Sequence, residues 1–200
     1  VRPGAAQALN GPLTPLHLGH DPAVKPYAHD PETARRLLAE AGYPNGLRLT
    51  VDIPTRLPDE APLLAQMMAE QWAEAGVEVA INAVADRPAY AEMVRAKRIH
   101  DLCCFDSSPL STFRVLREKL HSGVAGPWWQ GYRNPQVDAL IEQAQRTPDR
   151  AARQTLYRAA YRLVRDDAPW LFLYSPHWIW AAGPRARGWQ PSVDGVARLA

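Results

Sequence analysis

The sequence predicts an α/β fold in which a mostly parallel β-sheet is flanked by helices. Two similar runs, "LLAEAG" and "QWAEAG", each close an apolar-faced helical segment with a glycine and are followed by a segment of strand character. A third helical segment leads into the short apolar run "HDLCCF". Parallel strands need a long crossover connection, so helices that alternate with strands indicate a parallel sheet.

The first helix is expected to begin at Pro31 and to end before Gly42. Asp30 can cap the first turn, and proline suits the first helical position because its missing N–H has no helical partner there. Glycine tolerates the left-handed conformation that ends many helices. The alternating segment "LRLTVDI", residues 47–53, then predicts a strand.

The same pattern follows twice more along the chain. A helix is expected between Asp59 and Gly76, and a strand at residues 77–84. A third helix, from Pro88 to Arg98, precedes a short strand at residues 100–105.

The second half of the sequence is more helical. Helices are expected at residues 112–121, after Asn134 and from Thr147 onward, and short strands at residues 170–175 and 177–182.

Length and charge exclude several classes of protein. The 200 residues suffice for a hydrophobic core, and the formal net charge is +2. No dense Lys/Arg block supports a nucleic-acid partner, and no apolar run reaches the roughly 18 residues of a membrane span. No Walker A or Rossmann glycine motif appears, and no cofactor is expected. The first 29 residues lack an initiator Met and a signal peptide, so we expect a mature or truncated piece of a longer protein.

Enzyme chemistry has weak support in the residues. Cys103 and Cys104 are adjacent, so they point to opposite faces of a strand and are expected to be unreactive apolar side chains. A stand-alone hydrolase using Cys104 or Ser107 with a nearby histidine is the alternative, although no G-x-S-x-G motif is present. No catalytic residue is expected.

One trio has some metal-ligand character. His17, His20 and Asp21 stand close together, but a fourth ligand is not evident, and a packing role is the expected one. No metal site is predicted.

The order of motifs resembles a known family. "HDPETARRLLAEAGYPNGLRLTV", "MMAEQWAEAGVEVAINAVADRPAYAEMV", "YRNPQVDALIEQAQRTPDRAARQTLYRAAYRLVRDDAPWLFLYSP" and "RGWQPSVDG" together resemble the C-terminal lobe of family 5 extracellular solute-binding proteins. These are the oligopeptide-, dipeptide- and nickel-type receptors of ABC importers. The resemblance implies one lobe of the periplasmic-binding-protein type II kind, on the periplasmic or extracellular face of the membrane.

The resemblance also implies an organisation and a set of partners. Residues 1–200 would form a single C-terminal ligand-binding lobe, with an extended lead-in at 1–29, the α/β lobe at 30–182 and a terminal segment at 183–200 that returns toward a missing N-terminal lobe. The expected partners are a peptide or other amine-bearing small molecule, that second lobe, and the permease subunits of the importer.

Ligand contacts implied by the family fall on the loop after the strand "DLCCF". Counting back from "STF" places Asp106 at the carboxylate that pairs with a peptide's amino group. Ser107 and Ser108 can add hydroxyl contacts, and Phe105 is the aromatic ring there, where peptide binders usually carry a tryptophan. The alternative is that Asp106 or Ser111 caps the helix that follows.

Three more residues are candidates for ligand contact. Trp128 and Trp129 lie in a Gly-bounded loop, where one ring can face ligand while the other packs inward. Arg56 follows the first predicted strand at the sheet edge where open α/β sheets bind ligands. It would meet a ligand carboxylate there, or it is an ordinary surface charge.

Overall fold

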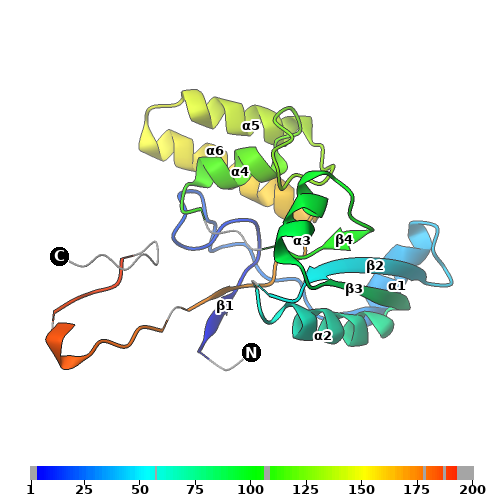
Figure 1. Ribbon diagram of the computed structural model, residues 1–200. Coiled ribbons are helices and arrows are strands. Elements are labelled where there is room, and N and C mark those ends of the chain that lie inside the picture. The colour runs from blue at the N-terminus through cyan, green and yellow to red at the C-terminus, as the bar shows by residue number, and fades with distance from the viewer. Residues whose placement is uncertain (1–3, 57, 106–108, 178, 187, 193–200) are drawn as a thin grey trace. The chain divides into compact units, whose positions relative to one another are not determined.

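The computed structural model describes residues 4–56, 58–105, 109–177, 179–186 and 188–192. Its elements follow the alternating order expected in the first half and are largely helical in the second half (Figure 1). In chain order they are β1 (Ala6–Ala8), α1 (Pro31–Glu40), β2 (Leu47–Pro54), α2 (Ala61–Ala73), β3 (Val77–Val84), α3 (Arg87–Arg95), β4 (Leu102–Cys103), α4 (Thr112–Leu120), α5 (Pro135–Arg146), α6 (Arg150–Asp167), β5 (Tyr174–Pro176) and a 3-10 turn at Pro184–Ala186.

The chain divides into two compact units. One unit comprises residues 27–108 and 116–138 and is called the sheet unit below. The other comprises residues 1–26, 109–115 and 139–200 and is called the helical unit. The expected organisation into a single lobe, with boundaries at 29 and 182, stays a prediction.

The sheet unit contains a parallel three-stranded sheet in the order β3–β2–β4. The central strand β2 is buried at its last four residues, Val51 to Pro54, as expected for a parallel strand covered on both faces. Val51 and Ile53 form a core cluster with Ala61 and Ala65 of α2. The predicted parallel sheet flanked by helices is therefore confirmed for this unit.

Two glycines fix how β2 and β3 begin. Gly46 and Gly76 both have positive φ, and a Cβ at Gly46 would lie 2.2 Å from the carbonyl oxygen of Gly76. The N–H of Leu47 donates to that carbonyl at 3.1 Å, so the two turns are joined directly. This contact starts the parallel register in which Leu47 lies opposite Val77.

Several residues that were predicted to cap or end helices do so in the structure. The Asp30 carboxylate accepts the N–H of Thr33 at 2.9 Å, and Gly42 has a φ of +96° directly after α1. Asn134 caps α5 through the N–H of Gln136 at 2.9 Å. The last helix begins later than Thr147, because Asp149 is the residue whose side chain caps it.

The helical unit pairs two short strands that are far apart in the sequence. Strand β1 lies antiparallel to β5, with Gln7 opposite Ser175. The predicted strand at 170–175 is therefore shortened to its last two residues plus Pro176, and no strand occurs among the described residues of 177–182. Strand β1 has only three residues, and each of them is paired with one residue of β5.

The segment before α1 packs on α6 within the helical unit. A Cβ at Gly19 would lie 2.3 Å from the Cβ of Tyr157, and one at Gly11 would overlap the ring of Tyr161. The two glycines thus permit a close approach that larger residues would block, and the expected extended lead-in is a packed segment. Among the described residues, no helix is long and apolar enough to cross a membrane.

Candidate functional site

Two of the predicted ligand residues lie together in the sheet unit. The rings of Phe105 and Trp128 are stacked, with centroids 6.0 Å apart and planes 24° from parallel. Phe105 follows the carboxyl end of β4, the sheet edge where open α/β folds bind ligands. Both side chains are half-buried, so the pair offers an aromatic surface, called the aromatic shelf below.

The loop that carries Trp128 is held on α3 and α4. The ammonium group of Lys97 donates to the carbonyl oxygens of Gly126 and Pro127, both at 2.9 Å, and the Gln130 amide donates to the carbonyl of Val94 at 2.8 Å. A Cβ at Gly126 would lie 2.2 Å from the carbonyl oxygen of Glu118, so glycine is needed for this approach. The shelf is therefore built on a fixed loop.

Trp129 has a different position from Trp128. Its indole N–H donates to the carbonyl of Tyr132 at 2.7 Å, inside its own loop, and the Arg133 guanidinium carbon lies 5.5 Å from its ring centroid. The prediction that one ring of the pair packs inward stays a prediction, and the bond to Tyr132 makes Trp129 the candidate for that role. Trp128 is then the better candidate for ligand contact.

Sequence reasoning missed two cations beside the shelf. Lys119 is only 3% exposed, and its ammonium nitrogen lies 5.0 Å from the Phe105 centroid and 5.5 Å from the Trp128 centroid. Arg95 is exposed at the end of α3, with its guanidinium carbon 5.8 Å from the Trp128 centroid. A signal for Lys119 was present, because it stands four residues after the buried Val115 on the inward stripe of α4.

A buried carboxylate supports β4 from inside the sheet. Asp52 is 0% exposed and accepts the backbone N–H of His100 at 2.7 Å, the His100 ring at 2.9 Å and the Asn82 amide at 2.7 Å. Burial alone would raise the pKa of Asp52, but these hydrogen bonds outweigh it and hold the pKa below its ordinary value. The carboxylate ties both neighbouring strands to β2.

Tyr90 joins α3 to the end of β4. Its hydroxyl donates to the carbonyl of Cys104 and lies 3.2 Å from the carbonyl oxygen of Asp52. The residue is 0% exposed, and burial raises the pKa of Tyr90 above its ordinary value. This contact fixes the backbone one residue before the shelf.

Cys103, the last residue of β4, and Cys104, which follows it, do not have the environment of a reactive thiol. Burial, followed by the neighbouring Cys104 and Asp52, raises the pKa of Cys103 to about 12. Cys104 packs against the core cluster of the sheet unit. The ring of His100 is held by Asp52 and so is oriented toward a carboxylate.

Slow alkylation of Cys103 is therefore expected. At pH 8 the native thiol holds roughly a thousandfold less thiolate than an ordinary cysteine, and thiolate is the reactive form. Iodoacetamide labelling followed by peptide mass spectrometry measures the rate, with the urea-unfolded chain as the control. Labelling at the unfolded rate would show that the thiol is not protected.

One Ser, His and Asp trio does meet, but its bonds are not those of a hydrolase. Ser122 donates through its hydroxyl and its N–H to the carboxylate of Asp138, in the first turn of α5. The His121 ring nitrogen accepts the N–H of Gly123 at 3.1 Å. A catalytic serine donates to the imidazole, whereas this hydroxyl donates to the carboxylate. The arrangement joins a loop to a helix start.

The remaining predicted residues are placed in part. Arg56 is exposed just after β2, where no hydrogen bond or ion pair to another described residue holds it. Asp106, Ser107 and Ser108 lie outside the described residues. Ser111 is the N-cap residue of α4, because its hydroxyl accepts the N–H of Arg114 at 3.4 Å and its carbonyl accepts that of Val115. The cap position is thus occupied by the second of the two candidates.

His17, His20 and Asp21 each have a structural contact in the helical unit. His17 contacts the Thr14 hydroxyl at 2.8 Å, the His20 ring lies edge-on to Tyr161, and Asp21 pairs with Arg162 at 2.6 Å. They do not form a metal-binding group among the described residues.

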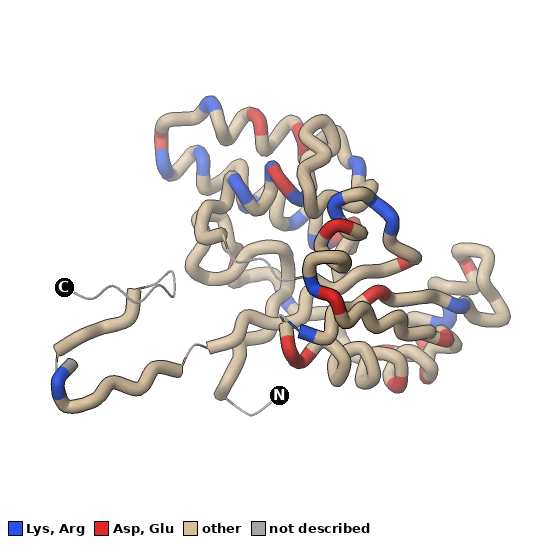
Figure 2. The backbone as a smooth tube through the Cα atoms, in the orientation of Figure 1, with Lys and Arg blue, Asp and Glu red and all other residues tan. Residues whose placement is uncertain are grey.

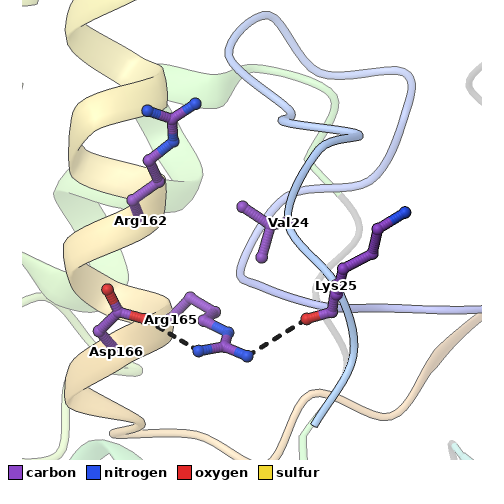
Figure 3. A pocket seen from close by; sticks show the side chains of 5 residues that line it. All are labelled: Val24, Lys25, Arg162, Arg165 and Asp166. Atoms are coloured by element: carbon purple, nitrogen blue, oxygen red, sulfur yellow. Dashed lines mark hydrogen bonds and ion pairs between the residues drawn. The ribbon is translucent and has the colours of Figure 1, made fainter.

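A small hollow of about 270 Å³ lies beside this ion pair. It is lined by Val24, Lys25, Arg162, Arg165 and Asp166 (Figure 3). Arg165 contacts Asp166 at 2.9 Å and the carbonyl of Lys25 at 3.2 Å, so the arginines attach the lead-in segment to α6.

Comparison with known proteins identifies the family. The family described as "Bacterial extracellular solute-binding proteins, family 5 Middle" matches residues 1–109, which is more than half of the chain. The chain belongs to this family. The sequence-based assignment to family 5 is therefore confirmed, and it agrees with the predicted periplasmic or extracellular location.

Several relatives of this family 5 chain bind small peptides. It is 32% identical over 199 residues to a glutathione-binding protein of Pectobacterium atrosepticum, covering 96% of this chain and 38% of that protein. It is 31% identical over 185 residues to di/tripeptide-binding protein 4 of Pseudomonas aeruginosa, covering 87% of this chain and 33% of that protein. The chain thus spans about a third of the length of these relatives.

Solved structures show the same fold. The periplasmic binding protein DppA of Helicobacter pylori, in complex with the peptide STSA, superposes with a TM-score of 0.76 at 25% identity, over 86% of this chain and 34% of that one. This likeness confirms the predicted α/β fold of the periplasmic-binding-protein type II kind. The family consists of solute-binding proteins, not enzymes.

Proposed function

We propose that this chain is the C-terminal ligand-binding lobe of the solute-binding component of an ABC importer. The solute is a peptide or another amine-bearing small molecule, and it is captured between this lobe and a second, N-terminal lobe of the same protein. The closed form then docks on the permease subunits in the membrane. Glutathione- and dipeptide-binding relatives support this class of solute.

The observation that carries the proposal is the aromatic shelf. Phe105 and Trp128 are 23 residues apart in the sequence, yet their rings stack at the carboxyl end of β4. Asp106 follows Phe105 directly and has the role of charge partner for the solute's amino group. A charge that loses its water on closure needs such a partner, because an unpaired buried charge is costly.

We propose a separate role for each residue of the site. Trp128 packs against apolar parts of the solute, because its indole is half-buried and its loop is fixed on α3 and α4. Ser107 and Ser108 add hydrogen bonds, and Arg56 meets a carboxylate. Trp129 supports the loop through its bond to Tyr132.

Native mass spectrometry of the full-length protein tests the proposal. The purified protein is mixed with dipeptides, tripeptides and glutathione, and with analogues of each that lack the α-amine. Complexes with free-amine peptides, and roughly tenfold or more weaker complexes with the analogues, are expected because a buried ion pair is lost. If no peptide binds, or if the analogues bind equally well, the proposed class of solute is wrong.

A further inference from the structure

Positive charge gathers around the aromatic shelf. Lys119 and Arg95 come from two different helices, and both lie within 6 Å of the Trp128 ring centroid. Figure 2 shows Lys and Arg positions on the stretch of chain that leaves α3. A cation over an indole face is attracted by the ring, so these positions are held by the shelf itself.

The two cations differ in what they can touch. Lys119 is 3% exposed, so it does not touch a solute directly. Arg95 is exposed, and no hydrogen bond or ion pair to another described residue engages its guanidinium group. A guanidinium that stacks on a ring keeps its N–H groups at the edge, where they match the two oxygens of a carboxylate.

We propose that Arg95 binds an acidic group of the solute at the edge of the aromatic shelf. The inference rests on the proposed function and narrows the solute class to molecules that carry a carboxylate next to an apolar part that packs on Trp128. Arg95 thereby determines specificity, whereas Lys119 is a positioning residue that lies against the rings of Phe105 and Trp128. Neither role was expected from the sequence.

The neighbouring loop provides a matched control. The guanidinium carbon of Arg133 lies 5.5 Å from the Trp129 ring centroid, much as that of Arg95 lies 5.8 Å from the Trp128 centroid, and both arginines are exposed. Trp129 is bound to its own loop through the carbonyl of Tyr132. Arg133→Gln therefore removes the same charge and the same kind of ring contact beside Trp129, which has a supporting role in the proposed site.

The test uses the full-length protein and a series of three probes. Leu-Glu, Leu-Gln and the C-terminal amide of Leu-Gln have nearly the same shape and carry two, one and no carboxylates. The affinity of the wild type, measured by calorimetry, is expected to fall about tenfold either from Leu-Glu to Leu-Gln or from Leu-Gln to its amide. The reason is the loss of a charge-assisted hydrogen bond at that step. That step should vanish in Arg95→Gln, persist in Arg133→Gln and shrink in Arg95→Lys.

The outcomes separate this inference from the proposed function. The role of Arg95 would be overturned if the loss of affinity along the probe series were the same in the wild type and in Arg95→Gln. It would also be overturned if the three probes bound the wild type with equal affinity. Both results would leave peptide binding intact. If Arg95→Gln and Arg133→Gln lowered the affinity for the probes equally, the effect would come from the overall charge of the protein. That result would also overturn the role of Arg95. If none of the probes binds the wild type, the proposed function itself fails, and this inference fails with it.

Discussion

Replacing Asp52 by alanine is expected to lower the free energy of opening the β3–β2–β4 sheet by about 3 kcal/mol. The carboxylate is 0% exposed and accepts three hydrogen bonds, from Asn82 on one side and from His100 on the other. Alanine would leave the His100 N–H and the Asn82 amide without their acceptor. A buried donor without an acceptor lowers the free energy of unfolding by more than its hydrogen bond had raised it.

Hydrogen exchange in the full-length protein measures this effect. The backbone N–H of Cys104 donates to the carbonyl of Asp52 at 3.0 Å, so its exchange reports opening between β2 and β4. Asp101→Ala is the matched control, because Asp101 also accepts a backbone N–H, that of Thr50 at 2.7 Å, but in an exposed place. Equal loss of protection in the two variants would contradict the structural role of Asp52.

The same carboxylate predicts how acid weakens the sheet. Because hydrogen bonds hold the pKa of Asp52 below its ordinary value, its ionised form stabilises the folded state. That stabilisation is complete above the unfolded pKa of about 4 and is lost as pH falls through the lowered folded pKa. Protection of the sheet should therefore decline below about pH 4, and more steeply in the wild type than in Asp52→Ala.

The parts of the fold that the sequence predicted are those with local signals. Asp30 and Gly42 bracket α1 through bonds and angles set within a few residues, so their roles are readable from the chain. The strand expected at 177–182 was wrong for the described residues of that stretch, because strand formation depends on a partner, and the pairing of β1 with β5 covers Tyr174–Pro176. Nothing near residue 177 encodes the length of a strand so far away in the sequence.

The sequence indicated which aromatic residues belong to the candidate site, but not how they meet or which charges lie beside them. Phe105 and Trp128 were recognisable as aromatic residues in loops that are candidates for ligand contact. Their stacking, however, depends on how the loop of residues 126–130 is attached to α3 and α4. Asp52 and Lys119 were overlooked because charged residues are normally placed at the surface. Both stand on inward-facing positions of their elements, and that conflict was the available signal.

Asp106→Asn is expected to weaken binding of an amine-bearing peptide by roughly 2–5 kcal/mol. The reason is the loss of a charge partner in a cleft that excludes water on closure, while the shape of the side chain is kept. Ser111 caps α4, so the substitution should leave the helix start unchanged. Isothermal titration of the full-length protein measures the affinity, and Ser111→Ala serves as a control that alters the cap without removing a charge.

A double comparison of the protein and the peptide tests the central claim most directly. Affinities are measured for the wild type and Asp106→Asn, each with a dipeptide and with its desamino analogue, which lacks only the α-amine. If the loop after β4 binds the amino group, removing the amine should weaken binding to the wild type strongly and binding to the variant very little. The expected coupling energy between the two changes is about 2 kcal/mol or more. Equal losses in the two proteins would show that the amino group is bound elsewhere and would contradict the account of this site.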